Sequence, residues 1–168
     1  AEYRQQISTS LNSHPIDLTL MHVGFAIAWF YQHETSEDKY LFFRNAYKHY
    51  KGFYSWPDDE LDDKEVAKIL GIEYGNLRTR TSRLWMKVKK LVNELNDAYI
   101  ATLNKRSLEI AKEIYETDNP DIESILEKLL DEAEKELPQY EDIVKLRKKK
   151  RVSTDSIFGK LKEYTSVF

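Results

Sequence analysis

Residues 62–84 read DDKEVAKILGIEYGNLRTRTSRL, and the expected fold is built outward from this stretch. Either leading aspartate is a good N-cap for a short helix that runs through Leu70, because its side chain accepts hydrogen bonds from the first helical N–H groups. Gly71 then breaks the helix and favours a sharp turn. A second helix begins near Gly75. The stretch therefore predicts two helices that meet at an angle around one glycine.

The second helix is predicted to continue beyond Tyr99, because apolar residues recur along it at three- and four-residue steps. This stripe has two interpretations. It is either the seam of a coiled-coil dimer or a surface that packs within the same subunit. Its members are Leu77, Leu84, Val88, Leu91, Leu95 and Ala98.

Two more helices are expected upstream. Residues 15–33 are apolar on nearly every side, which is typical of a buried helix. Residues 35–38 (TSED) resemble a capping box that starts a second helix, which ends near Lys51 and Gly52. A loop over residues 52–61 follows. The many aromatic side chains between residues 40 and 56 favour core packing, and stacking on unpaired bases is the alternative.

Downstream, amphipathic helices are expected near residues 100–115 and 121–137, joined by a turn in which Asn119 is the cap and Pro120 the first helical residue. They predict an antiparallel hairpin that is strongly acidic, because residues 107–144 hold 3 basic and 13 acidic side chains. Residues 145–151 (KLRKKKR) are basic. This segment contacts phosphates, pairs with the acidic hairpin, or is a disordered solvated run.

Composition narrows the class of protein. The chain has 168 residues, a net charge of −3, no cysteine, 5 glycines and 4 prolines. These values exclude disulfides and thiol catalysis and disfavour an all-β fold. No apolar run is long enough to span a membrane, and the first residues lack the order of a signal peptide. We therefore expect a cytoplasmic, all-α helical bundle.

We expect three parts: a helical domain over residues 1–100, an acidic interaction hairpin over 101–140 and a basic tail over 141–168. The catalytic motifs H-E-x-x-H, G-x-S-x-G and the glycine-rich phosphate loop are missing, so we expect neither an enzyme nor a cofactor. A metal site on His22 and His33 would need further ligands, and satisfied or surface histidines are the better interpretation.

The outer face of the second helix carries side chains that suit DNA. Arginine binds guanine and phosphate, asparagine binds adenine, and threonine binds phosphate or a thymine methyl group. The predicted DNA-binding residues are Tyr74, Asn76, Arg78, Thr79, Arg80, Arg83 and Lys87.

The segments KEVAKILGI (64–72) and LRTRTSR (77–83) resemble region four of bacterial sigma factors and related helix-turn-helix regulators. The resemblance covers about 22 residues and implies that the second helix enters the major groove. One departure is Thr81, where the family usually has an apolar residue. The segment of a sigma factor that melts promoters is not visible, so a complete sigma factor is not expected.

Residues 106–137 show a weaker resemblance to the helical hairpin that closes the N-terminal domain of DnaB-type replicative helicases. The segments IAKEI (110–114) and LLDEAEK (129–135) carry it. The resemblance implies subunit packing and primase contact, although the chain has no phosphate-binding loop of a helicase motor.

Together these patterns predict a bacterial or phage transcription regulator that binds double-stranded DNA, with RNA polymerase or a replication protein as a possible partner. A homodimer through the stripe is a further hypothesis. The alternative function is an interaction module of a replication complex that binds a helicase, primase or loader through the acidic hairpin.

Overall fold

The computed structural model describes residues 15–117 and 119–166, and the side chains of residues 20–117 and 119–155. Every regular element within these ranges is a helix, which confirms the all-α prediction. The helices are α2 (Pro15–His33), α3 (Ser36–Lys51), α4 (Asp63–Leu70), α5 (Tyr74–Glu94), α6 (Asp97–Ala101), α7 (Lys105–Tyr115), α8 (Ile122–Glu136) and α9 (Tyr140–Ser166).

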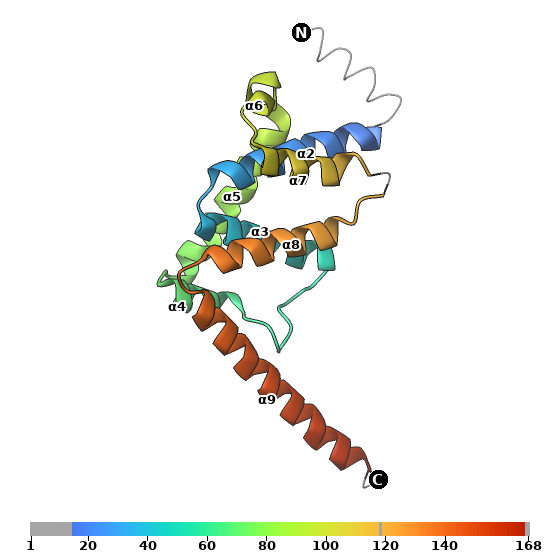
Figure 1. The fold of residues 1–168 in the computed structure, drawn as a ribbon. Helices are drawn as coiled ribbons and strands as arrows, with labels where there is room; N and C mark the ends of the chain where they lie inside the picture. The colour runs from blue at the N-terminus through green and yellow to red at the C-terminus, as the bar shows by residue number, and fades with distance from the viewer. Residues whose placement is uncertain (1–14, 118, 167–168) are drawn as a thin grey trace.

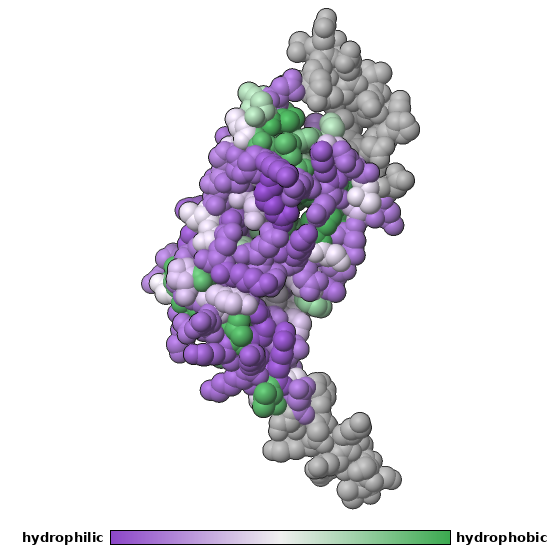
Figure 2. Space-filling model, viewed as in Figure 1, coloured by the Kyte–Doolittle hydropathy of each residue, from purple (hydrophilic) through white to green (hydrophobic). Residues whose placement is uncertain are grey.

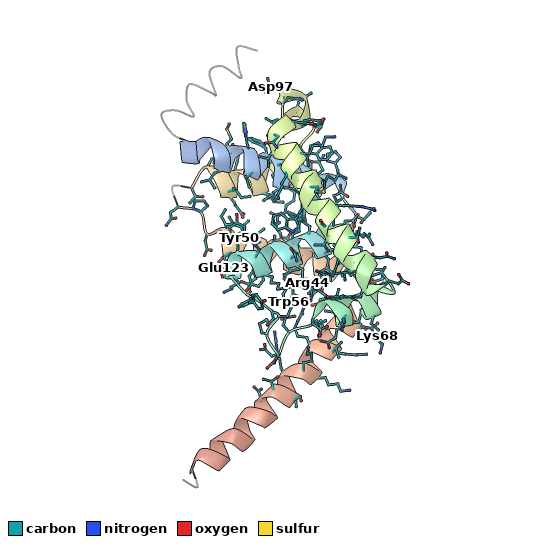
Figure 3. All side chains as sticks on the ribbon, turned by 180° about the vertical axis from the view of Figure 1, so that it is seen from behind. Arg44, Tyr50, Trp56, Lys68, Asp97 and Glu123 are labelled. Atoms are coloured by element: carbon teal, nitrogen blue, oxygen red, sulfur yellow. The ribbon has the colours of Figure 1, made fainter. Side chains whose placement is uncertain are left out.

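Two helix pairs form the body of the molecule. α2 lies beside α7, and α3 lies beside α8 (Figure 1). α5 crosses both pairs, as the view from behind shows (Figure 3), and its N-terminal end packs on α4. α9 starts next to α4 and α8 and then extends away from the body.

The core lies between these helices. Its largest buried side chains come from α2 and α3, where Phe30, Phe42 and Phe43 contact one another at ring-centroid distances of 4.7–6.0 Å. Gly24 of α2 lies against α7, since an added Cβ would come within 3.0 Å of the Ala111 carbonyl oxygen. The face in view in Figure 2 is mostly hydrophilic.

The predicted boundaries of α3 are confirmed. Thr35 is the N-cap and accepts a hydrogen bond from the Asp38 N–H, and Gly52 ends the helix in the left-handed region at φ 72°. The loop over residues 52–61 is also present. These local signals work because they satisfy backbone groups that the helix itself leaves free.

The prediction that the helix from Gly75 continues beyond Tyr99 is wrong. α5 ends at Glu94, and Leu95 adopts an extended conformation. Asn96 then starts α6, because its side chain accepts hydrogen bonds from the N–H groups of Ala98 and Tyr99. A strong N-cap therefore starts a new helix within a continuous apolar pattern.

The apolar stripe of α5 packs within the protein's own core. Leu84, Val88 and Leu91 are buried against α2 and α3. Of its C-terminal members, Leu95 is half-buried and Ala98 is exposed. Of the two interpretations, packing within the subunit is the one observed, and these buried residues are not free to form a dimer seam.

α7 and α8 use their apolar faces differently from the antiparallel hairpin that we predicted. α7 packs along α2 and α8 packs along α3, and α7 and α8 touch each other less. Their residues Ile110, Ile114, Leu126 and Leu129 belong to the same core as those of α2 and α3. The predicted cap at Asn119 is also wrong, because α8 begins at Ile122 with the preceding aspartate as its N-cap.

Among the described residues, no helix is both long and apolar enough to cross a bilayer.

Candidate nucleic-acid interface

The turn between α4 and α5 is built by local capping. Asp62 and Glu65 form a reciprocal capping box at the start of α4. Gly71 ends the helix at φ 71°, and its N–H donates to the Ala67 and Lys68 carbonyl groups. The left-handed conformation costs little for glycine and much more for other residues. The predicted pair of helices around Gly71 is therefore present.

Small and apolar side chains hold the two helices together. Val66 and Ala67 of α4 are buried, and Leu77 of α5 is 2% exposed. Thr81, where the resemblance has an apolar residue, is also buried, and its hydroxyl donates to the Leu77 carbonyl oxygen at 2.9 Å. Because this bond satisfies the hydroxyl within its own helix, threonine is accommodated at an apolar position.

Two of the predicted DNA-binding residues are engaged with the protein's own carboxylates. Arg80 donates to Asp38 at 2.7 Å and to Glu37, both in the first turn of α3. Lys87 forms an ion pair with Glu34, whose side chain is 9% exposed. Burial lowers the pKa of Arg80, but the hydrogen bonds to Asp38 and Glu37 outweigh it and raise the pKa above its ordinary value. These contacts tie α5 to the α2–α3 turn, so neither side chain is free on the outer face.

The other two predicted arginines are exposed. Within the described residues, neither Arg78 nor Arg83 takes part in an ion pair or a hydrogen bond. The Arg78 guanidinium lies 5.8 Å from the Tyr74 ring centroid, and Lys64 of α4 lies 5.7 Å from the same ring. Tyr74 is 39% exposed. An aromatic ring therefore bridges one cation from each helix.

The first turn of α5 is open. Asn76 is exposed, and a Cβ added to Gly75 would meet no atom within 4 Å. The N-cap residue Glu73 makes no side-chain hydrogen bond to the helix. Thr79 is exposed and donates its hydroxyl to the Gly75 carbonyl oxygen at 3.0 Å. Free N–H groups at a helix N-terminus are a favourable site for a phosphate oxygen.

α4 and α5 together present an outward surface that we call the α4–α5 face. Lys68, which belongs to this face, is labelled in Figure 3. The polar residues of the face are exposed and make no ion pair within the described residues. They are Lys64, Lys68, Asn76, Arg78, Thr79 and Arg83. Sequence reasoning missed the two lysines, although their four-residue spacing puts them on one side of the short helix.

The basic segment over residues 145–151 is helical and partly neutralised. Arg147 forms two hydrogen bonds with Glu134 of α8, at 2.7 and 2.8 Å, and one with Glu60. Lys150 donates to the Glu60 carbonyl oxygen at 2.7 Å and pairs with Glu65. Of the three interpretations of this segment, pairing with the predicted acidic hairpin is supported by Arg147 and Glu134 alone, and the other contacts go to the 52–61 loop and α4.

The aromatic and histidine residues are mostly structural. Tyr40, Phe42 and Phe43 are buried, whereas the aromatic residues of the 52–61 loop are partly or fully exposed. His33 stacks on Trp29 with 4.0 Å between ring centroids. Within the described residues, no group of three or more histidine, aspartate or glutamate side chains could hold a metal ion.

Protein-family models, curated proteins and solved structures gave no match.

Proposed function

We propose that the protein binds double-stranded DNA through the α4–α5 face, with α5 in the major groove. α4 braces α5 across the groove through the Gly71 turn. Arg78 and Arg83 contact phosphates and guanine, and Asn76 and Thr79 contact bases or backbone. Lys64 and Lys68 lie on the bracing helix and contact the flanking phosphates.

One observation carries this proposal. The inner side of α5 is anchored in the core by Leu77, Leu84 and Val88, whereas Arg78 and Arg83 point outward without a carboxylate partner in the described residues. The rigid helix fixes the backbone of both arginines, and neither guanidinium has to give up an ion pair within the described residues before it meets a phosphate. Neutralising phosphates and releasing their counterions supplies most of the affinity of such proteins.

The regulatory part of the proposal depends on the resemblance to sigma region four. We propose a transcription regulator of bacterial or phage type that acts in the cytoplasm, and RNA polymerase is its expected partner. The paired Arg80 and Lys87 are reassigned from DNA contact to positioning α5 on the α2–α3 turn.

The test compares two doubly substituted full-length chains. Arg78→Ala/Arg83→Ala removes the two outward arginines, and Lys105→Ala/Lys112→Ala removes two exposed cations of α7 that have no ion pair in the described residues. Both variants lose two positive charges. Binding to a fluorescent random-sequence duplex is measured by anisotropy at several salt concentrations.

We expect the arginine variant to bind more weakly and to lower the slope of log K against log salt by about 2, since each lost phosphate contact removes about 0.9. The lysine variant should keep the slope of the unsubstituted protein. Equal slopes for both variants, or no salt-dependent binding by the unsubstituted protein, would refute DNA binding through this face.

The replication-complex alternative has less support. The apolar faces of α7 and α8 are used in the core, with Ile110, Ile114, Leu126 and Leu129 all buried. A partner would have to recognise the remaining acidic surface alone. Binding of helicase or primase by the full chain in the absence of DNA would favour this alternative.

A further inference from the structure

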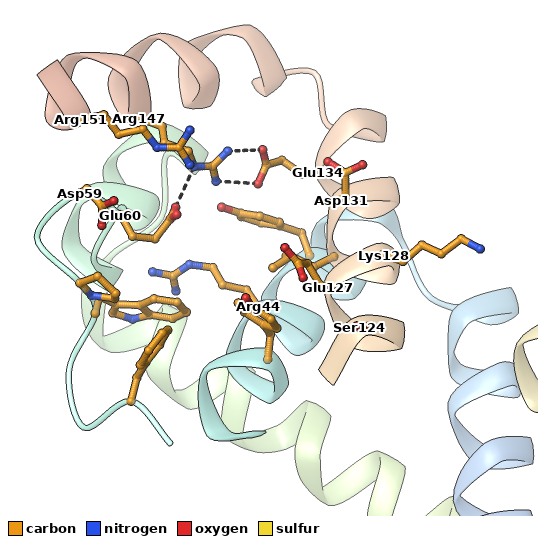
Figure 4. Close-up of a pocket in the computed structure, with 16 residues that line it drawn as sticks. Arg44, Asp59, Glu60, Ser124, Glu127, Lys128, Asp131, Glu134, Arg147 and Arg151 are labelled. Carbon is orange, nitrogen blue, oxygen red and sulfur yellow. Dashed lines mark hydrogen bonds and ion pairs between the residues drawn. The ribbon is translucent and has the colours of Figure 1, made fainter. Parts of the chain in front are cut away.

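A cavity of about 630 Å³ lies between α3, the 52–61 loop, α8 and the start of α9 (Figure 4). This volume is within the range of about 300–1,000 Å³ that small-molecule sites occupy. The cavity is separate from the α4–α5 face, because none of the side chains that we assigned to DNA lines it. DNA binding therefore does not account for this cavity.

The inner wall of the cavity holds two fixed guanidinium groups. Arg44 is 5% exposed and donates to Asp63 at 2.5 Å and to the Leu61 carbonyl oxygen at 2.7 Å. Arg147 is held by Glu134 and Glu60. A guanidinium has more N–H groups than these bonds use, so both side chains keep donors for a molecule in the cavity.

A buried hydroxyl completes this donor wall. Tyr40 lines the cavity and is 1% exposed, and its hydroxyl makes no hydrogen bond within the described residues. Burial raises its pKa to about 12, with smaller effects from Arg44 and Glu134, which also line the cavity. The phenol is therefore neutral and remains a donor. This hydroxyl is not one of the fully enclosed polar atoms without a partner, so it is open to the cavity and can donate to an acceptor bound there.

The side walls are aromatic. Tyr47, Phe53 and Trp56 line the cavity. The Trp56 ring is fixed, because its Nε1–H donates to Asp63 at 3.0 Å and the Arg44 guanidinium lies 3.9 Å from its centroid. Rigid aromatic walls favour a flat ligand that can stack on them.

The charges of the cavity disfavour an anion. Arg44 and Arg147 are already matched by carboxylates, and the Lys128 side chain extends away from the cavity in Figure 4. Arg151 also lines the cavity and makes no ion pair within the described residues, but the lining as a whole holds five carboxylates against four cationic side chains. Asp59 and Glu127 are exposed at the rim and have no ion pair within the described residues. A phosphate or carboxylate ligand would meet these carboxylates. A neutral ligand fits this cavity if its acceptor atoms face the inner donor wall and its N–H donors face the exposed carboxylates.

We propose that this cavity binds a neutral, flat heteroaromatic molecule of nucleoside size. The ring stacks against the aromatic walls, its acceptor atoms take hydrogen bonds from the Tyr40 hydroxyl and the free Arg44 and Arg147 N–H groups, and its donors face Asp59 and Glu127. This proposal is independent of DNA binding, since the two sites share no residue.

The test uses adenosine, guanosine, cytidine and thymidine as probes, with ribose and inorganic phosphate as controls. Binding to the full chain is measured by titration calorimetry, and the contacted residues are located by ¹H–¹⁵N chemical-shift changes. We expect at least one nucleoside to bind at one site with a Kd below about 1 mM. Shifts should concentrate at Tyr40, Trp56 and Arg147, and neither control should bind there.

Two matched variants identify the site. Tyr40→Phe removes only the unpartnered hydroxyl and should weaken nucleoside binding about two- to tenfold, the value of one neutral hydrogen bond. Tyr54→Phe, at a residue that is fully exposed and does not line the cavity, should bind like the unsubstituted protein. Circular dichroism checks that both variants fold. The proposal is overturned if no nucleoside binds, if Tyr40→Phe binds unchanged, or if inorganic phosphate competes for the site.

Discussion

Removing Glu134 is the most informative perturbation of the fold. Its side chain is 6% exposed and accepts two hydrogen bonds from Arg147, which is 19% exposed. This pair joins α8 to α9, and Glu60 extends it to the loop before α4. The hydrogen bonds to Glu134 raise the pKa of Arg147 above its ordinary value. Because an arginine keeps its charge in proteins even without such bonds, Arg147 remains charged in the variant.

The expected cost of Glu134→Ala follows from this geometry. Deleting one partner of a buried ion pair costs about 3–5 kcal/mol, because the other charge is left without compensation. Glu60 still accepts one bond from Arg147, and the cavity gives that guanidinium access to water. We therefore expect the lower end, about 3 kcal/mol of the free energy of unfolding. In a domain of this size, that loss lowers Tm by roughly 6–12 °C.

The assay is urea unfolding followed by circular dichroism at 222 nm. Glu127→Ala is the matched control, since Glu127 is an exposed glutamate on the same helix without an ion pair in the described residues. It should change stability by no more than about 0.5 kcal/mol. A double variant, Glu134→Leu/Arg147→Met, should recover most of the stability, because apolar residues of similar volume replace buried ion pairs well. A loss below about 1 kcal/mol for Glu134→Ala would refute our account of this network.

Three further predictions concern turns and pH. Gly71→Ala should destabilise the protein by about 1–2 kcal/mol in thermal unfolding, because φ is 71° at this position. Gly75→Ala should instead stabilise it by about 0.5–1 kcal/mol, since this helical site has open space around it; a loss of stability there would contradict the helical assignment. Burial raises the pKa of Glu132, but hydrogen bonds from Arg106 and Tyr31 outweigh it and lower the pKa below the ordinary value of 4.5. Its contribution to stability is thus complete above about pH 4.5 and lost as pH falls through the lowered pKa. Glu132→Gln should therefore flatten the acid side of a Tm–pH profile. An unchanged profile would contradict this prediction.

Local signals in the sequence predicted most helix boundaries. The caps at Thr35 and Asp62 and the glycines at 52 and 71 act through nearby backbone groups, so a short window of sequence contains the whole interaction. The boundary at Asn96 was missed, although its cap is equally local. Its capping side chain competes with an apolar pattern that continues through it, and periodicity alone favours the longer helix.

Tertiary contacts were harder to predict. Arg80 lies among arginines and lysines in the sequence, and its partners Glu37 and Asp38 are more than forty positions away. No local pattern indicates that α3 begins beside α5. The partners of α7 and α8 were missed likewise, because an amphipathic face shows that a helix is buried on one side and does not show against which neighbour.

The distribution of cations on α5 explains how one helix can have both a structural and a binding role. Arg80 and Lys87 are seven residues apart, about two turns, and therefore face the same direction, toward the carboxylates of the α2–α3 turn. Arg78 lies on another side of the helix, whereas Arg83 stands three residues after Arg80 and four before Lys87 and so lies next to them. Both are exposed and make no ion pair within the described residues. If the paired cations were released to bind a polyanion, Glu34 would be left half-buried without a partner, at a cost to α5 positioning. Arg78 and Arg83 have no carboxylate partner to release, so they can meet phosphates without that cost, and for this reason the DNA-binding proposal depends on them and not on the paired Arg80 and Lys87.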